Sequence, residues 1–147
     1  MIDSTVSRLG ALKRGSETPT RRTKEKRVYR VKVLLDSLPN RKLGYKLEKK
    51  DSDIHLAVRD RSGATMVAEF PNKGCTAGAQ HRYQMEAARA ALLQACEPPA
   101  AKFRELTGTA IITGVLFFDF FHHQRGVAPN VAELHPVLAF EGTCAHA

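Results

Sequence analysis

The chain has 147 residues, of which 43% are hydrophobic, and this length and composition predict one domain with a single core. The formal charge of +8 is unevenly distributed: residues 1–50 hold 15 Lys and Arg against 5 Asp and Glu, a net +10, whereas residues 51–147 hold 8 against 10, a net −2. The most apolar run, residues 110–121, is about half as long as a bilayer crossing requires, which argues against a transmembrane span.

The cysteines and the N-terminus indicate the expected compartment. Cys75, Cys96 and Cys144 fit neither a disulfide framework nor a Cys-x-x-Cys metal site, which favours free thiols in a reducing environment. No apolar segment of the signal-peptide kind follows the first charges. We therefore expect a soluble cytoplasmic protein without a membrane partner.

The first 27 residues mix Ser, Thr, Gly and Pro with charges and show no sustained period of 2 or 3.6. This composition predicts a flexible basic arm at residues 1–27. A domain at residues 28–140 and a tail at residues 141–147 complete the predicted organisation.

Three strands are predicted after the arm. Alternation begins at Val28 and continues to Leu35, and residues 43–48 are interpreted as a continuation of this first strand, bent or bulged near Gly44. Residues 53–59 and 65–70 form the second and third strands. The connection at residues 60–64 has the length and the Ser-Gly pair of a hairpin turn.

A helix and two further strands follow. Residues 79–96 have strong helix formers with a 3.6-residue apolar period, ended by Pro98-Pro99. Residues 109–118 form the fourth strand, with Gly114 as a predicted bulge or bend, and residues 133–140 form the fifth.

Three strands, a helix and two strands is the element order of the OB-fold, a five-stranded Greek-key barrel. The sequence therefore predicts a mainly β fold with one helix, built as an OB-like barrel. An open, mixed α+β sheet of the same elements is the alternative.

Three motifs carry a family resemblance over residues 28–140. They read Asp-Ile-His-Leu at 53–56, Ala-Glu-Phe-Pro at 68–71 and Gly-Val-Ala-Pro-Asn at 126–130, the last followed by Glu-Leu-His-Pro at 133–136. The chain resembles a family of small bacterial proteins of unknown function that is OB-fold-like. The resemblance implies a shared compact fold, and it brings no activity or substrate with it.

Ionisable residues on the second, third and fifth strands form the candidate site. A spacing of two residues on a strand aims both side chains at one face, as for Glu133 and His135. If these strands bring their polar faces together, imidazoles and carboxylates form a ligand set for a divalent metal, which can activate water for phosphodiester hydrolysis. They could also act as general acid and base without a metal, or form cross-strand pairs with a purely structural role. The candidate catalytic residues are Asp53, His55, Glu69, Glu133 and His135, and the candidate metal ligands are His55, His135 and Glu133.

The basic front end indicates a second kind of partner, because clustered Lys and Arg bind DNA or RNA through phosphate contacts. A solubilising tail is the alternative. The predicted nucleic-acid contacts are Arg21, Arg22, Lys24, Lys26, Arg27, Arg30, Lys32, Arg59 and Arg61.

Our first functional hypothesis is a non-enzymatic OB-like module that contacts nucleic acid through its basic N-terminal region. A small metal-dependent phosphodiesterase or nuclease-like hydrolase and a protein–protein interaction module are the two alternatives. The sequence fixes neither the cofactor nor the oligomeric state.

Overall fold

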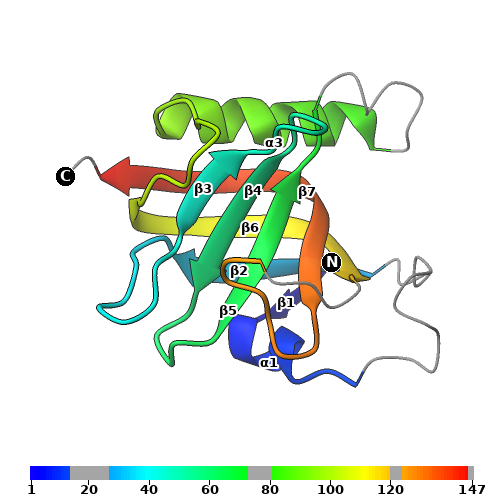
Figure 1. Ribbon diagram of the computed structural model, residues 1–147. Coiled ribbons are helices and arrows are strands. Elements are labelled where there is room, and N and C mark those ends of the chain that lie inside the picture. Colours follow the sequence, from blue (N-terminus) through cyan, green and yellow to red (C-terminus); the bar gives the residue numbers. More distant parts are fainter. Residues whose placement is uncertain (14–26, 73–80, 120–123, 146–147) are drawn as a thin grey trace.

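The computed structural model describes residues 1–13, 27–72, 81–119 and 124–145. The described residues form one strongly curved sheet of seven strands, with one helix across the sheet near its C-terminal strand and a short helix below it (Figure 1). The strands are β1 (Ile2–Ser4), β2 (Val28–Leu34), β3 (Gly44–Leu47), β4 (Ile54–Arg59), β5 (Thr65–Phe70), β6 (Thr107–Phe118) and β7 (Ala132–Ala145), and the helices are α1 (Val6–Gly10) and α3 (Arg82–Ala95).

The strands lie in the order β1-β2-β6-β7-β5-β4-β3. β1 runs parallel to β2 and β5 runs parallel to β7, whereas the other neighbouring pairs are antiparallel. One further pair, Leu34 with Arg59, joins β2 to β4 across the sheet. The mainly β class is confirmed, but the sheet has seven strands where five were predicted.

β2, β4 and β5 form where the alternating pattern predicted strands. The connection between β4 and β5 is a hairpin, in which the Asp60 N–H donates to the Ala64 carbonyl at 3.0 Å. β4 and β5 are buried on both faces, because loops from distant parts of the chain cover the face opposite the core.

The interpretation of residues 43–48 as part of the first strand is wrong. Residues 44–47 form a separate strand, β3, which pairs with β4 at the end of the sheet. The Ser37 hydroxyl accepts a hydrogen bond from the Leu43 N–H at 2.8 Å, which holds the loop that separates the two strands. Backbone groups of Tyr45 also pair with Arg104 on the other side of β3.

The prediction of a flexible arm is wrong for residues 2–10, which form β1 and α1. Thr5 caps α1 by accepting a hydrogen bond from the Arg8 N–H at 3.1 Å. Val6 and Leu9, one helical turn apart, are fully buried in the core. These elements are too short to show a period in the sequence, and burial of two apolar side chains stabilises them instead.

α3 confirms the predicted helix within the described residues. Met85, Ala88 and Leu92 form its buried stripe against the sheet, and α3 packs on β7 (Figure 1). Arg82 and Glu86 form an ion pair one turn apart, at 3.4 Å. No helix within the described ranges is long and apolar enough to cross a bilayer.

β6 and β7 are both longer than predicted, and the expected tail from residue 141 is wrong for residues 141–145. These residues pair with the start of β6, where Thr107 lies opposite Ala145. The register of the two strands shifts on both sides of Gly114, so the predicted bulge or bend corresponds to an irregularity in the β6–β7 pairing. A Cβ atom at Gly114 would lie 2.9 Å from the Cβ of Leu134, so the close approach of β7 requires glycine there.

A disulfide joins Cys96 to Cys144, and the prediction of free thiols is therefore wrong for both residues. The bond links the end of α3 to the end of β7, with the two Cα atoms 5.2 Å apart. A separation of 48 residues conceals this pairing in the sequence, because the fold alone brings the two ends together. Disulfides persist in oxidising compartments, so the cysteines no longer support a cytoplasmic location. Cys75 lies outside the described residues.

Candidate metal centre

Three neighbouring strands place a row of polar side chains on one face of the sheet. Lys46 on β3 lies directly opposite His55 on β4, and His55 lies directly opposite Glu69 on β5. Residues opposite each other in antiparallel strands project from the same face. The predicted grouping of His55 with Glu69 is therefore produced by the register of the β4–β5 hairpin.

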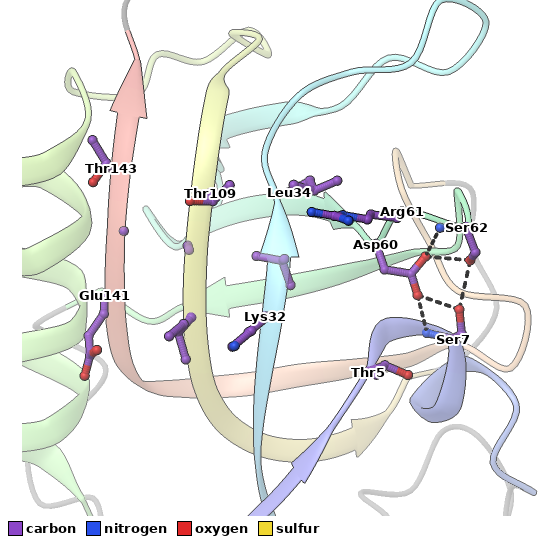
Figure 2. A pocket seen from close by; sticks show the side chains of 14 residues that line it. Thr5, Ser7, Lys32, Leu34, Asp60, Arg61, Ser62, Thr109, Glu141 and Thr143 are labelled. Carbon is purple, nitrogen blue, oxygen red and sulfur yellow. Dashed lines mark hydrogen bonds between the residues drawn. The ribbon is translucent and has the colours of Figure 1, made fainter.

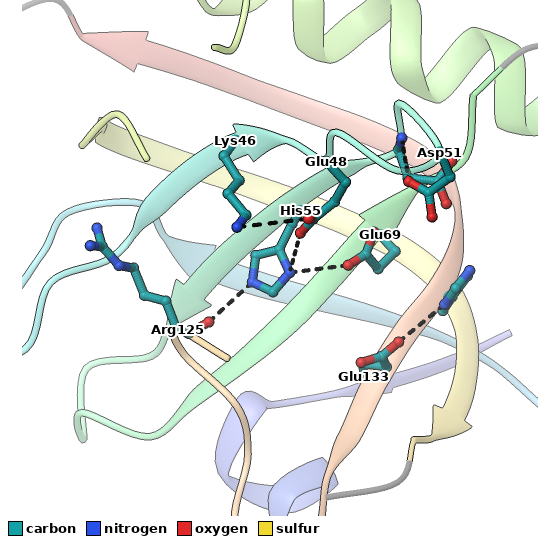
Figure 3. Close-up of polar contacts among 9 residues, drawn as sticks. Lys46, Glu48, Asp51, His55, Glu69, Arg125 and Glu133 are labelled. Carbon is teal, nitrogen blue, oxygen red and sulfur yellow. Dashed lines mark hydrogen bonds and ion pairs between the residues drawn. The ribbon is translucent and has the colours of Figure 1, made fainter. Parts of the chain in front are cut away.

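His55 is held at both of its ring nitrogens (Figure 3). Nε2 donates its proton to the backbone carbonyl of Arg125 at 3.1 Å, because a carbonyl oxygen can only accept. Nδ1 lies 3.1 Å from Oε1 of Glu69. The side chain is 1% exposed, so these contacts replace the solvation that the ring loses on burial.

The surroundings of His55 and Glu69 raise the pKa of both groups. Burial lowers the pKa of His55, but the hydrogen bond and the charge of Glu69 raise it more, with further help from the Arg125 carbonyl and Glu48. Burial raises the pKa of the Glu69 carboxyl, and its contacts with His55 offset this only in part. The proton shared by the pair is therefore lost at higher pH than a free imidazole would lose it.

Glu48 supplies a third ligand atom to the same place. It follows β3, and its N–H donates to the Asp53 carbonyl at 2.8 Å, which closes the turn between β3 and β4. Oε1 of Glu48 lies 3.7 Å from Nδ1 of His55. Among the residues that the structure describes, Glu48, His55 and Glu69 form a group whose ligand atoms all lie within 4.8 Å of one another.

The candidate ligands Glu133 and His135 form a separate pair on β7. Nδ1 of His135 lies 3.1 Å from Oε1 of Glu133, and the ring packs edge-on against Phe117 at 5.4 Å. Burial lowers the pKa of His135, but the hydrogen bond and charge of Glu133 raise it more. The predicted ligand set of His55, His135 and Glu133 therefore differs from the group that the fold brings within bonding reach, in which Glu48 and Glu69 accompany His55.

The two pairs nevertheless lie near each other on the same face. Glu133 is opposite Val67 in the parallel β5–β7 pairing. Val67 and Glu69 are two residues apart, so their side chains point to the same side of β5. The charges of His135 and Glu133 both act on the Glu69 carboxyl. Four of the five predicted site residues thus share one face of β4, β5 and β7.

Asp53, the fifth, lies at the side of this cluster. Its Oδ1 accepts a hydrogen bond from the Asn72 N–H at 2.8 Å. Burial raises the pKa of its carboxyl, and the hydrogen bond from Asn72 offsets this only in part. Asp53 therefore has a structural contact in the turn after β5, and it lies outside the group of three ligand atoms.

The segment at residues 124–131 covers the cluster and positions the Arg125 carbonyl. Gly126 has a φ of 81°, and a Cβ atom there would lie 2.6 Å from the Cβ of Ala57 on β4. Glycine thus allows the backbone to approach the sheet closely enough for Arg125 to reach His55. Asn130 fixes the other end of the segment, because its side-chain amide donates to the carbonyl oxygens of Leu9 at 2.8 Å and Leu12 at 3.0 Å.

A groove of about 870 Å³ lies elsewhere, on the outer side of β2, β6 and β7 (Figure 2). Lys32 on β2 and Arg61 in the β4–β5 hairpin both line it. Its wall is fixed by Asp60, whose carboxylate accepts hydrogen bonds from the Ser7 and Ser62 hydroxyls at 2.5 and 2.6 Å. Two of the predicted nucleic-acid contacts therefore lie in one depression of the surface.

The other predicted nucleic-acid contacts are distributed differently. Arg30 forms a two-point ion pair with Asp3, at 2.7 and 3.1 Å. Arg59 donates to the backbone carbonyls of Asp36 and Asp60, so it has a structural role next to the β2–β4 junction. Arg27 is exposed. Arg21, Arg22, Lys24 and Lys26 lie outside the described residues.

Sequence reasoning missed Glu48 and Arg125. Lys46 and Glu48 are two residues apart, and this spacing would have placed both beside His55 had residues 44–47 been recognised as a strand paired with β4. Arg125 contributes its backbone carbonyl, and no side-chain pattern can reveal such a role.

Comparison of the chain with models of protein families, with curated proteins and with solved structures finds no match. The likeness to a family of small bacterial proteins, based on the three motifs, stays a prediction.

Proposed function

We propose that the chain is an OB-like binding module that holds one divalent cation through Glu48, His55 and Glu69. The barrel part of this proposal is supported by the pairing of β2, β6, β7, β5 and β4 in a ring, with the Leu34–Arg59 pair joining its ends. The parallel β5–β7 pair and the position of α3 between β5 and β6 agree with that fold.

The observation that carries the cation proposal is the meeting of three ligand atoms within 4.8 Å. One imidazole nitrogen and two carboxylate oxygens form a mixed ligand set that suits Zn²⁺ or Mn²⁺. Nδ1 of His55 lies 3.1 Å from Glu69 and 3.7 Å from Glu48, and the charges of both carboxylates raise the pKa of the imidazole. A cation would bind where a proton on Nδ1 would otherwise face the two carboxylates.

The contact between His55 and Arg125 supports the same conclusion. A histidine that binds a metal through one nitrogen commonly donates the other N–H to a carbonyl or carboxylate, which fixes the ring orientation. Here Nε2–H donates to the Arg125 carbonyl, which leaves Nδ1 facing Glu48 and Glu69. The ring is thus oriented for coordination before a cation arrives.

Calorimetric titration with Mn²⁺ and Zn²⁺ tests the cation site. We expect one cation per chain for the unaltered protein, and we expect Glu48→Gln to weaken binding by about tenfold or more, because it removes a charged ligand. Glu48 is 28% exposed, so this variant keeps the core intact. Glu133→Gln is the matched control, since it makes the same change in the neighbouring Glu–His pair.

Two outcomes would contradict the cation site as described. One is the absence of cation uptake by the unaltered protein. The other is a loss of affinity in Glu133→Gln as large as that in Glu48→Gln, because the cation would then also depend on the Glu–His pair of β7.

We propose as a second candidate function that the basic N-terminal region and its neighbouring groove contact single-stranded nucleic acid. The specific observation in its favour is that Lys32 and Arg61, which are far apart in the sequence, line the same groove. Threonine side chains from β6 and β7, Thr109 and Thr143, add hydroxyl groups to the lining. Cationic and hydroxyl groups of this kind bind phosphate oxygens.

Binding of a single-stranded oligonucleotide at several salt concentrations tests the second candidate. The double variant Lys32→Gln, Arg61→Gln is expected to bind more weakly and to reduce the slope of log affinity against log salt by about 1.4, since each lost phosphate contact reduces it by about 0.7. The control is Lys42→Gln, Lys102→Gln, which removes the same charge from exposed positions away from the groove. Equal affinity and slope in the two double variants would rule out the groove as the contact surface.

A further inference from the structure

Two cationic side chains surround the aromatic ring of Phe103 beside the candidate metal centre. The Lys46 ammonium lies 5.2 Å and the Arg125 guanidinium 4.2 Å from the centre of that ring. The His55 ring meets Phe103 edge-on, with centroids 5.4 Å apart. Phe103 thus holds two positive charges next to the imidazole that is proposed to bind the cation.

The centre is accessible from the side on which Lys46 lies. The side chains of Lys46 and Glu48 are 31% and 28% exposed, whereas those of His55 and Glu69 are 1% and 10% exposed. A cation bound by these residues would therefore have its free coordination positions toward Lys46 and Glu48. Figure 3 shows Lys46 directed toward Glu48, above the His55 ring.

The charge of Lys46 is linked to the occupancy of the centre. Its Nζ lies 3.7 Å from Oε2 of Glu48, and the other oxygen of the same carboxylate faces His55. A cation that binds Glu48 neutralises part of the carboxylate charge that faces Lys46. Lys46 can then form an ion pair with an incoming anion.

The Arg125 guanidinium lies on the other side of the His55 ring from Glu48 and Glu69 (Figure 3). It donates to the Leu43 carbonyl at 3.3 Å and stacks on Phe103. Lys46, in contrast, is directed toward Glu48 and therefore lies beside the free positions of a bound cation.

We infer that the cation site takes a phosphate group as its ligand, with phosphate oxygens on the cation and on Lys46. This inference rests on the proposed cation site. Divalent cations and lysine ammonium groups both favour phosphate oxygens, and a tetrahedral anion can contact two positive groups at once. The inference names a ligand class and includes no bond-breaking step.

Titration of the Mn²⁺-loaded protein with inorganic phosphate and, in parallel, with dimethyl phosphate tests it. We expect binding of at least one of these probes, and the comparison separates a free phosphate or monoester from a diester. Lys46→Gln is expected to weaken phosphate binding by about tenfold, the effect of losing one charge-assisted hydrogen bond. It is not expected to weaken Mn²⁺ binding, because Lys46 contributes no atom to the group of three ligand atoms.

Arg41→Gln serves as the control, because it removes one positive charge from an exposed position in the loop between β2 and β3. Mn²⁺ uptake without phosphate binding, or phosphate binding that Lys46→Gln weakens no more than Arg41→Gln does, overturns the inference while the cation site stands. Phosphate binding that is equally strong without Mn²⁺ also overturns it. A lack of Mn²⁺ uptake removes the proposed function itself, and the inference with it.

Discussion

Replacing Gly44 by alanine is expected to lower the free energy of unfolding by about 3 kcal/mol, through combined backbone strain and overpacking. Gly44 has a φ of 133°, a conformation that L side chains rarely adopt. A Cβ atom at this position would collide with the Arg104 carbonyl oxygen and would lie 2.8 Å from the Arg104 carbonyl carbon. The Arg104 backbone is held by two hydrogen bonds to Tyr45, at 3.0 and 2.9 Å, so it can move away only by breaking them.

Gly63→Ala is the matched control for this prediction. Gly63 also has a positive φ, 93°, but a Cβ atom there meets only the side chain of Leu38 at 3.6 Å. We expect a loss of about 1 kcal/mol from backbone strain alone. Urea denaturation followed by circular dichroism measures both values, and equal losses in the two variants would contradict the proposed collision.

The Gly44→Ala change also bears on the candidate metal centre. β3 begins at Gly44, carries Lys46 and leads directly to Glu48. A shifted β3 would move the Glu48 carboxylate away from His55. We therefore expect weaker Mn²⁺ binding in Gly44→Ala and unchanged binding in Gly63→Ala, measured under conditions where both variants are folded.

Removal of the disulfide is expected to cost about 4 kcal/mol of stability, from the entropy that a closed loop of 48 residues removes from the unfolded chain. Cys96 and Cys144 are both buried, so Cys96→Ala with Cys144→Ala keeps the sites apolar. The bond ties the end of α3 to the end of β7. Without it, the end of β7 is held by its pairing with β6, and the end of α3 by packing and by the hydrogen bond from Tyr45 to Glu97.

Urea denaturation with and without a reducing agent measures this contribution. The oxidised protein should lose stability on reduction, whereas the double alanine variant should show the same unfolding midpoint in both conditions. Thiol titration of the denatured protein should find two more reactive thiols after reduction. An unchanged midpoint for the unaltered protein on reduction would contradict the prediction.

The disulfide is also connected to the candidate metal centre through Tyr45. The Tyr45 hydroxyl donates to the carbonyl of Glu97, the residue next to Cys96. Burial raises the pKa of the Tyr45 hydroxyl, the charge of Arg104 lowers it, and the charge of Glu97 raises it further. The net effect is a raised pKa, so the hydroxyl keeps its proton and remains a donor. β3 is thus tied to the end of α3 as well as to β4.

The sequence by itself determined the elements whose residues alternate or repeat along one segment. β4 and β5 were predicted within one residue of their bounds, because alternating apolar residues and a short hairpin specify both strands locally. The same period of two correctly placed His55 and Glu69 on one face. α3 followed from its 3.6-residue apolar period for the same reason.

Only the tertiary structure decided which of these polar residues meet. The pairing of β3 with β4 brings Glu48 to His55, and the 124–131 segment brings the Arg125 carbonyl from 70 residues away. Likewise, Val6 and Leu9 become ordered by burial in the core, and Cys96 bonds to Cys144 across 48 residues. Such contacts join segments that are distant in the chain, and their energy comes from packing and register that no local pattern contains. The sequence therefore determined the alternating strands β4 and β5 and the faces of their side chains, whereas the candidate three-residue metal centre forms only because the folded sheet brings its members together.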